Sequence, residues 1–533
     1  MKADHAPALL LLLTGLVFLP ILGAGFVWDD ATLIVDNPHT ASLSAALRSF
    51  GGDLWAGLGE ADDASSYYRP LLTLDLALDR ALFGLSPAWH HARSLGWHLL
   101  AVGGLLGLLR RLGVGPMAAA AAASLLALHP AGAEAVAFAA ARNDPMAVAL
   151  LLWGWCLLYE GGRGAIIGGL LALGAALSKE SVLLLAPAGL LIGGAPGRRI
   201  AGATLLGALV ALGLRGLAGV PLSTGVGLDA ALSVAAPAGA AFLRDLVVPI
   251  GLVAPGTLLG VEPSPGLGWW LVGLGLLALG HDPRSRAGLA FAILTAGPAL
   301  LAVARYGAAS HRYLYAPLAG LALAAAPWLA THPRRSLVGL GLMGLLGVGA
   351  LSPGLGRWSD DLTFWTAMSE AHPSSYAFAG LGRTRADLGD LPGAAAAWDE
   401  AITASDPIPA ACYNVAAAHI RLGEPLRAAE LGLLALSRGC ARSPELLAPT
   451  ALGLALGGRW DEALSLANEV ERDPTGKAVL VRLAGAVRAG DTDPLRQMAA
   501  ASPEGGRLIE MVAALLDAAG EAEAARWARD LPG

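Results

Sequence analysis

The sequence predicts an all-α protein in which a membrane-embedded helical domain is followed by a water-exposed domain of helical repeats. Of the 533 residues, 55% are hydrophobic and 15% are charged, and the mean hydropathy is +0.58. A soluble protein of this composition would expose large apolar patches to water. Long Leu/Ala/Gly runs continue to about residue 355, whereas charged residues occur every few positions beyond Trp358. We therefore expect a membrane domain over 1–356 and a soluble domain over 357–533.

The apolar runs of the first domain are long enough to cross a membrane about eleven times. A membrane-spanning helix needs about 17–25 largely apolar residues. The candidate segments are 6–24, 92–109, 115–129, 145–160, 164–178, 181–195, 200–218, 268–280, 287–304, 313–330 and 336–353. The first of them is followed by an acidic pair rather than by a small-residue cleavage site. We therefore interpret it as an uncleaved span and not as a signal peptide.

Arginine placement predicts the orientation of these spans, because cytoplasmic loops are enriched in Lys and Arg. Arginines occur at every second loop, on the side of Lys2, in the clusters Arg110–Arg111, Arg163, Arg198–Arg199, Arg284 with Arg286, and Arg334–Arg335. The alternation requires the proline-containing segment 230–256 to lie in the interface or to re-enter the membrane. The loop 25–91 and the C-terminal domain are then extracytoplasmic. In a bacterial inner membrane, that side is the periplasm.

The C-terminal domain repeats a helix–turn–helix pattern. Its turn glycines Gly389, Gly423 and Gly458 are 34 and 35 residues apart. An alanine follows each of them by five residues, where two helices must approach closely: Ala394, Ala428 and Ala463. This period and pattern are typical of tetratricopeptide repeats, and weaker copies surround Gly490 and Gly520. We expect an α-solenoid that binds a partner or serves as a scaffold.

Charge and cysteine content exclude some classes of function. A net charge of −6 and a pI near 6.0 give no basic surface for nucleic acid. The three cysteines match no metal-binding spacing, and we expect no metal and no other cofactor. Cys412 and Cys440 could pair in an oxidising compartment, but the interpretation that we prefer is two small buried side chains.

Polar residues that are expensive to bury gather at the predicted extracytoplasmic ends of the spans. Asp29 and Asp30 directly follow the first span. Two adjacent carboxylates could supply a general base or a metal ligand, or could cap the following helix. The same side carries Arg69, His91, His129, Glu134, Arg142, Asp144, Lys179, His311 and Arg312. This set suits a lipid-linked phosphate, although each basic residue could also snorkel to the interface or form a salt bridge.

Several short motifs occur in order along the chain. They are F-V-W-D-D (26–30), D-N-P (36–38), Y-R-P-L (68–71), A-L-H-P (127–130), E-A-V-A (134–137), R-N-D (142–144), L-S-K-E (177–180) and H-R-Y-L-Y (311–315). Together with Trp358 and the repeats, they resemble the membrane glycosyltransferases of the GT-C class. The most similar family joins a GT-C domain to tetratricopeptide repeats, and its eukaryotic members are luminal protein O-mannosyltransferases.

The resemblance implies a transferase that takes a sugar from a polyprenyl-phosphate donor. It implies Asp29 or Asp30 as the catalytic base. It implies lipid-phosphate binding by Arg69, Lys179 and Arg312. It implies a cavity lined by His91, His129, Glu134, Arg142, Asp144 and His311. The acceptor would be a protein Ser/Thr or an envelope glycan engaged by the repeats. The alternative function is a non-enzymatic, membrane-anchored scaffold for envelope protein complexes.

Overall fold

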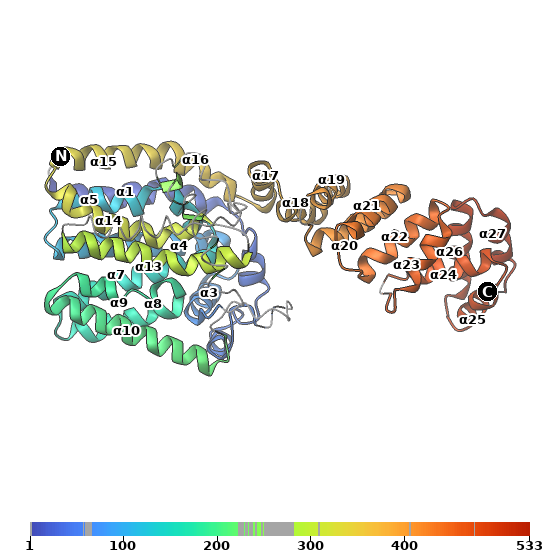
Figure 1. Cartoon of the computed structure of the whole chain (residues 1–533), viewed down its shortest axis with the longest axis horizontal. Helices are drawn as coiled ribbons and strands as arrows, with labels where there is room; N and C mark the ends of the chain where they lie inside the picture. Colours follow the sequence, from blue (N-terminus) through green and yellow to red (C-terminus); the bar gives the residue numbers. More distant parts are fainter. Residues whose placement is uncertain are drawn as a thin grey trace. The chain divides into compact units, whose positions relative to one another are not determined.

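The computed structural model divides the chain into two compact units, Met1–Ala367 and Met368–Gly533. It describes residues 3–56, 58, 67–221, 229, 233, 238–239, 242, 244–246, 249, 282–306, 310–404, 407–473 and 475–532. Every element assigned within these residues is a helix (Figure 1). The predicted all-α class is therefore confirmed.

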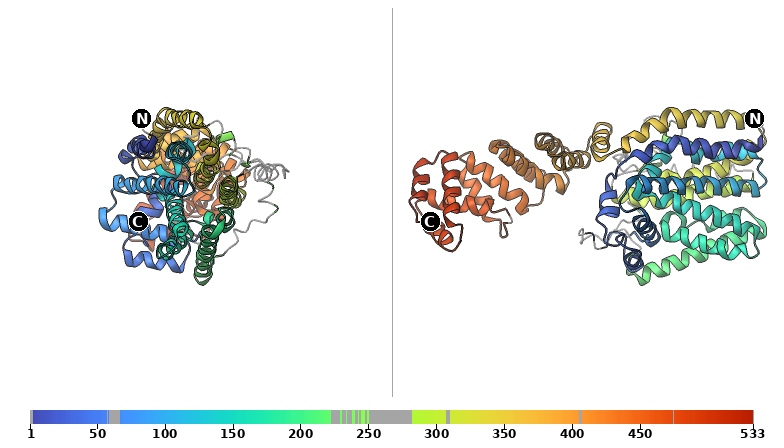
Figure 2. Two further views of the ribbon diagram at one scale, coloured as in Figure 1. Left: turned by 90° about the vertical axis from the view of Figure 1, so that its left-hand side faces the viewer. Right: turned by 180° about the vertical axis from the view of Figure 1, so that it is seen from behind.

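The first unit is a bundle of long helices that run side by side in all the views of Figures 1 and 2. Its helices are α1 Ala6–Phe18, α2 Leu43–Ala46, α3 Pro70–Phe83, α4 Pro87–Arg111, α5 Pro116–Leu128, α6 Ala133–Ala137, α7 Asn143–Glu160, α8 Gly164–Ser178, α9 Ala186–Leu191, α10 Gly194–Leu217, α13 Pro283–Tyr306, α14 Tyr315–Ala330, α15 Pro333–Leu346, α16 Ser352–Leu355 and α17 Asp361–Ala371, which carries the boundary between the units. Short 3₁₀ or π segments are η1 Ala3–His5, η2 Leu19–Gly23, η3 Ala31–Val35, η4 Leu47–Gly51, η5 Pro130–Gly132, η6 Ala139–Ala141, η7 Glu180–Val182, η8 His311–Leu314, η9 Gly347–Leu351 and η10 Gly356–Trp358.

Length and composition allow five stretches among the described residues to cross a membrane. They are Ala6–Gly23, Pro87–Arg111, Gly194–Leu217, His311–Ala330 and Pro333–Trp358. A sixth is formed if α5 and the helical turn after it, bent by 53°, are counted as one span. Because such stretches bury their apolar surface in lipid, the chain is a multi-pass membrane protein.

Most of the predicted spans coincide with helices of the bundle. Segment 181–195 does not form one continuous helix, because it contains only η7 and the six-residue α9. Pro187 lies in the first turn of α9, and a proline restricts helix formation in the residues before it. The predicted span 268–280 lies outside the described residues, and so does most of the interfacial segment 230–256.

The two ends of the bundle differ in chemistry. At one end, Arg111 of α4 pairs with Glu160 of α7 at 2.5 Å, and Arg199 of α10 donates to the carbonyl oxygen of Leu158 at 2.8 Å. At the opposite end, α1 runs through η2 into the loop that carries Asp29 (Figure 1). The arginine-rich ends and the predicted site thus lie at opposite ends of the same helices.

The second unit consists of ten helices within the described residues, joined in consecutive pairs. They are α18 Ser375–Asp387, α19 Leu391–Thr403, α20 Pro409–Leu422, α21 Pro425–Ser437, α22 Pro444–Leu456, α23 Trp460–Asn468, α24 Lys477–Arg488, α25 Asp493–Ala500, α26 Gly505–Ala518 and α27 Ala522–Arg529. The turn glycine of every pair has a φ between 76° and 87°, a conformation that favours glycine: Gly389, Gly423, Gly458, Gly490 and Gly520. These turns are where the sequence predicted them, while the tetratricopeptide assignment stays a prediction.

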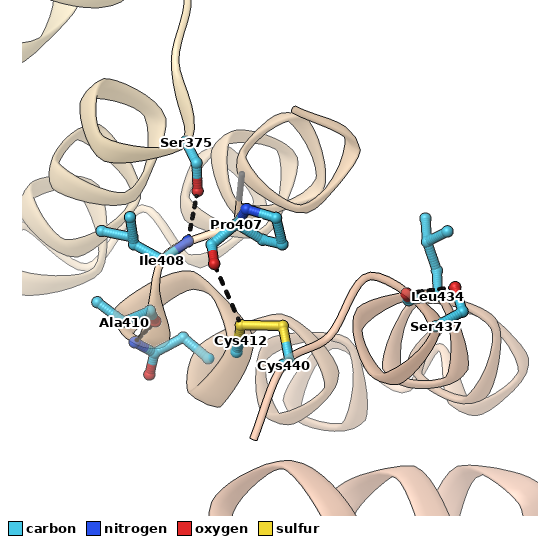
Figure 3. The surroundings of a disulfide bond; sticks show 9 residues. Ser375, Pro407, Ile408, Ala410, Cys412, Leu434, Ser437 and Cys440 are labelled. Atoms are coloured by element: carbon cyan, nitrogen blue, oxygen red, sulfur yellow. Dashed lines mark hydrogen bonds between the residues drawn. A yellow bond between two sulfur atoms is a disulfide. The ribbon is translucent and has the colours of Figure 1, made fainter. Parts of the chain in front are cut away.

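A disulfide joins α20 to the residues that follow α21 (Figure 3). It links Cys412 to Cys440 with a Cα–Cα distance of 6.0 Å, within the usual range for a disulfide. The preferred interpretation of two unpaired side chains was therefore wrong. Spacing along the chain could not show the pairing, because the turn between α20 and α21 brings the two backbones together.

Candidate active site

The loop that follows α1 and η2 makes a sharp turn next to its acidic pair. Trp28 has a φ of 57°, in the left-handed region that few residues other than glycine adopt. After this turn, the next two residues lie in different environments. Asp29 is partly exposed, whereas Asp30 is fully buried.

Asp30 anchors the loop to the rest of the bundle. Its carboxylate oxygens accept the backbone N–H of Val27 at 3.2 Å and of Ala140 at 2.7 Å. Burial raises the pKa of Asp30 to about 7, which would suit a general base. However, neither carboxylate oxygen is exposed, and each accepts a hydrogen bond from a backbone N–H. The side chain of Asp30 is therefore placed to anchor the loop and not to accept a proton from a substrate. The side chain also makes no cap hydrogen bond to η3, which excludes helix capping as its role.

Asp29 shares a small cavity with the three predicted phosphate-binding side chains. This cavity of about 50 Å³ is lined by Asp29, Arg69, Lys179 and Arg312. The remaining lining residues are Leu33, Leu54, Trp55, Tyr67, Phe138, Ala140, Asn143 and Tyr313. The four charged residues come from four separate segments, and the first and the last of them are 283 positions apart in the sequence. The fold therefore brings one carboxylate and three cations to the same place.

Each cation also has a carboxylate partner. Arg69 donates Nε and Nη2 to the same oxygen of Glu180, at 3.0 and 2.9 Å. Burial alone would raise the pKa of Glu180, but the attraction and hydrogen bonds of Arg69 lower it. Lys179 Nζ donates to Asp144. The resulting pairs hold both cationic side chains in fixed orientations at the cavity.

Aromatic rings surround Arg312. Its guanidinium carbon lies 5.6 Å from the ring centre of Trp28, 5.5 Å from that of Phe138 and 5.8 Å from that of Tyr313. Glu134 lies 3.7 Å from Arg312 Nε and accepts the backbone N–H of the same residue at 3.2 Å. Cation–π attraction and the carboxylate stabilise the charge of this partly buried arginine.

A second cavity, of about 300 Å³, shares Tyr67, Arg69, Lys179 and Tyr313 with the first. Its apolar lining residues include Leu183, Leu184, Leu212, Pro298, Ala299 and Ala302. The charged residues at this cavity are Arg69, Asp144, Lys179, Glu180 and Arg215. The two cavities together therefore offer a charged region beside an apolar one.

Arg215 is a candidate that the sequence analysis missed. It lies in the last turn of α10, is 6% exposed, and donates to the carbonyl oxygen of Pro221 at 2.5 Å. The sequence did contain a signal for Arg215, because a charged residue within an apolar span usually lines a cavity or pairs with another charge.

The other predicted cavity-lining residues divide into two groups. Asp144 lines the larger cavity. His91, His129, Glu134, Arg142 and His311 line neither cavity. Glu134 still reaches the site through Arg312, whereas the other four make bonds elsewhere in the unit.

Those four side chains are buried and hydrogen-bonded to protein groups. His91 lies 3.0 Å from the carbonyl oxygen of Gly25, His129 lies 3.3 Å from that of Leu246, and His311 lies 3.1 Å from Asp245. Arg142 is fully buried between Asp75, at 3.1 Å, and Asp79. Among the described residues, no group of three or more His, Cys, Asp or Glu side chains is placed to hold a metal ion.

Comparison with known proteins agrees with the resemblance seen in the motifs. Over 173 residues, which are 31% of the chain, it is 30% identical to Protein O-mannosyl-transferase Tmtc1 of Drosophila melanogaster. Over 135 residues it is 36% identical to human Protein O-mannosyl-transferase TMTC1, and over 130 residues 32% identical to Drosophila Tmtc2. The chain is similar to the TMTC proteins.

This relationship to the TMTC proteins is partial. The chain spans 20% of the length of Drosophila Tmtc1 and 15% of that of human TMTC1. No family model matches the chain. No solved structure matches it either.

Proposed function

We propose that the protein is a GT-C-class membrane glycosyltransferase that moves a sugar from a polyprenyl phosphate to an extracytoplasmic acceptor. The observation that carries the proposal is the small cavity in which Asp29 lies with Arg69, Lys179 and Arg312. Its chemistry combines a proton acceptor with cations that suit a phosphate. The names of the TMTC relatives, all protein O-mannosyl-transferases, support a transferred mannose.

The donor would occupy both cavities. Arg69 and Lys179 line the two of them, so a phosphate held there would lie between the small charged cavity and the larger apolar one. The polyprenyl chain would follow the apolar residues of α10 and α13, and the sugar would point toward Asp29. Charge-assisted hydrogen bonds to phosphate are stronger than those between neutral groups. Arg215 adds a fourth cation on the side of the lipid.

The reaction would be a single displacement with inversion at the anomeric carbon. Asp29 takes the proton of the acceptor hydroxyl, and the hydroxyl oxygen forms a bond to the anomeric carbon. The bond from that carbon to the phosphate oxygen breaks, and its electron pair leaves with the lipid phosphate. Arg69, Lys179 and Arg312 stabilise the negative charge that develops there.

The sidedness of the protein fits this proposal. The arginine-rich ends of α4 and α10 would face the cytoplasm, and Asp29 and the repeats would then be on the periplasmic side of a bacterial inner membrane. The disulfide in the second unit supports this placement, because disulfides persist in oxidising compartments. The repeats would bind the acceptor, either a protein Ser/Thr or an envelope glycan.

Transfer from radiolabelled polyprenyl-phosphate mannose to periplasmic extract, catalysed by the purified full chain, tests the proposal. We expect Asp29→Asn to lower the rate about 100-fold or more, because it removes the proton acceptor. Asp36→Asn is the matched control, since Asp36 is an exposed carboxylate of the same loop and lines neither cavity.

Two results would count against the proposal. Transfer that survives Asp29→Asn would exclude Asp29 as the base. A wild-type chain that transfers no sugar to any acceptor, yet captures envelope proteins through its repeats, would favour the scaffold instead.

A further inference from the structure

The loop that carries Asp29 is bound to the segment that leads into the second unit. Gly25 N–H donates to the carbonyl oxygen of Ser359 at 2.7 Å, and Trp28 N–H donates to Asp361 Oδ1 at 2.8 Å. These contacts join residues more than 330 positions apart, and all of them lie within the first unit. Asp361 is the first residue of α17.

Aromatic packing strengthens this junction. The ring of Trp28 stacks on Phe138 with centres 5.1 Å apart and on Phe364 with centres 5.7 Å apart. Trp358 and Trp365 each contact Phe364 as well, with ring centres 5.1 and 5.0 Å away. Offset and edge contacts of this kind fix ring positions. The Trp28 side chain is therefore held from two sides, by η6 and its flanks and by α17.

The backbone of Trp28 needs such support. A tryptophan at a φ of 57° is in a sparsely populated conformation, which persists only where the surroundings enforce it. The hydrogen bond to Asp361 acts on the N–H of this same residue. Since Asp29 is the next residue, the direction in which its carboxylate points depends on this turn.

We propose that Asp361 is a positioning residue for Asp29. By accepting the N–H of Trp28, its carboxylate maintains the left-handed turn that directs Asp29 into the cavity with Arg69 and Lys179. The start of α17 is thus part of the active site of the transferase, although it touches no substrate. The catalytic part of this inference rests on the proposed function, whereas the orientation of residue 29 does not.

Two variants of Asp361 separate its hydrogen bond from its charge. Asp361→Ala removes the acceptor, and Asp361→Asn retains a carbonyl oxygen at the same position. We expect Asp361→Ala to lower kcat about 10- to 100-fold with little change in the KM for the lipid donor, and Asp361→Asn to restore most of the loss. Asp360→Asn is the matched control, because Asp360 is exposed and asparagine also caps a helix such as α17.

A second measurement does not depend on catalytic activity. In the variant Asp29→Cys, a maleimide reports how accessible residue 29 is, since Cys156 is buried and the other two cysteines are paired. We expect the labelling rate to change several-fold when Asp361→Ala is added and to return toward the original value with Asp361→Asn. The melting temperature of each variant identifies any that fail to fold.

The outcomes distinguish this inference from the proposed function. Unchanged labelling and unchanged kcat in Asp361→Ala would overturn the positioning role, whatever the chain catalyses. Altered labelling in a protein that transfers no sugar would leave the positioning of residue 29 standing and would refute the transferase.

Discussion

At the scale of single residues, Asp29 and Asp30 show how neighbours in sequence acquire different roles. The turn at Trp28 directs Asp29 to a cavity with three cations and buries Asp30 against two backbone N–H groups. The sequence left the choice of base between them open. The dihedral angles of Trp28 decide which of the two carboxylates lines the cavity, and no composition or spacing reveals those angles.

The buried carboxyl of Asp30 predicts a pH dependence of stability. Burial raises its pKa from 3.8 to about 7, so the folded state favours the protonated form. Its contribution to stability is therefore fully present below pH 3.8 and is lost as the pH rises through about 7. We expect the melting temperature of Asp30→Asn in detergent, relative to that of the wild type, to rise between about pH 4 and about pH 7. A difference that is independent of pH would contradict the raised pKa.

Arg142 gives a second prediction at this scale. It is fully buried between Asp75 and Asp79, whereas Arg93, which also pairs with Asp75, is 28% exposed. Removing one member of a buried ion pair leaves an uncompensated charge and costs about 3–5 kcal/mol. We expect Arg142→Ala to lower the melting temperature strongly and Arg93→Ala to lower it less. An Arg142→Ala protein of normal stability that binds the donor poorly would instead support the cavity role predicted from sequence.

At the scale of helices, α13 and α14 cross at a position where each helix has a glycine. A Cβ added to Gly288 would lie 2.6 Å from the carbonyl oxygen of Gly320, and one added to Gly320 would lie 2.7 Å from that of Gly288. Small residues let membrane helices approach this closely. The apolar stretches were visible in the sequence, but the choice of packing partner was not, because most apolar helices can pack against one another.

Two glycine substitutions within α13 test the crossing. We expect Gly288→Ala to destabilise the bundle, because its methyl group would collide with backbone atoms of α14. Gly297→Ala in the same helix should be neutral or stabilising by about 0.5–1 kcal/mol, since no atom lies within 4 Å of the added Cβ. Thermal unfolding in detergent compares the two variants, and equal effects would contradict the crossing.

At the scale of the whole molecule, the disulfide and the orientation make a joint prediction. If the second unit is periplasmic, one of the three cysteines, Cys156, should react with a thiol reagent after denaturation without reductant. A reporter that is active only in the periplasm should also be active when fused after residue 533. Three reactive thiols together with an inactive reporter would place the second unit in the cytoplasm.

Local patterns in the sequence determined the membrane class, most of the helical segments, the five turn glycines and the segments whose charged residues line the small cavity. These features depend on apolar periods, helix breakers and charge spacing within short windows, and such windows are readable without a fold. The tertiary structure decided which carboxylate enters the cavity, that Arg142 is an ion-pair partner, that Arg215 lines the larger cavity and that Cys412 pairs with Cys440. Those outcomes depend on backbone direction at single residues and on contacts between distant segments, and both exist only once the helices have packed.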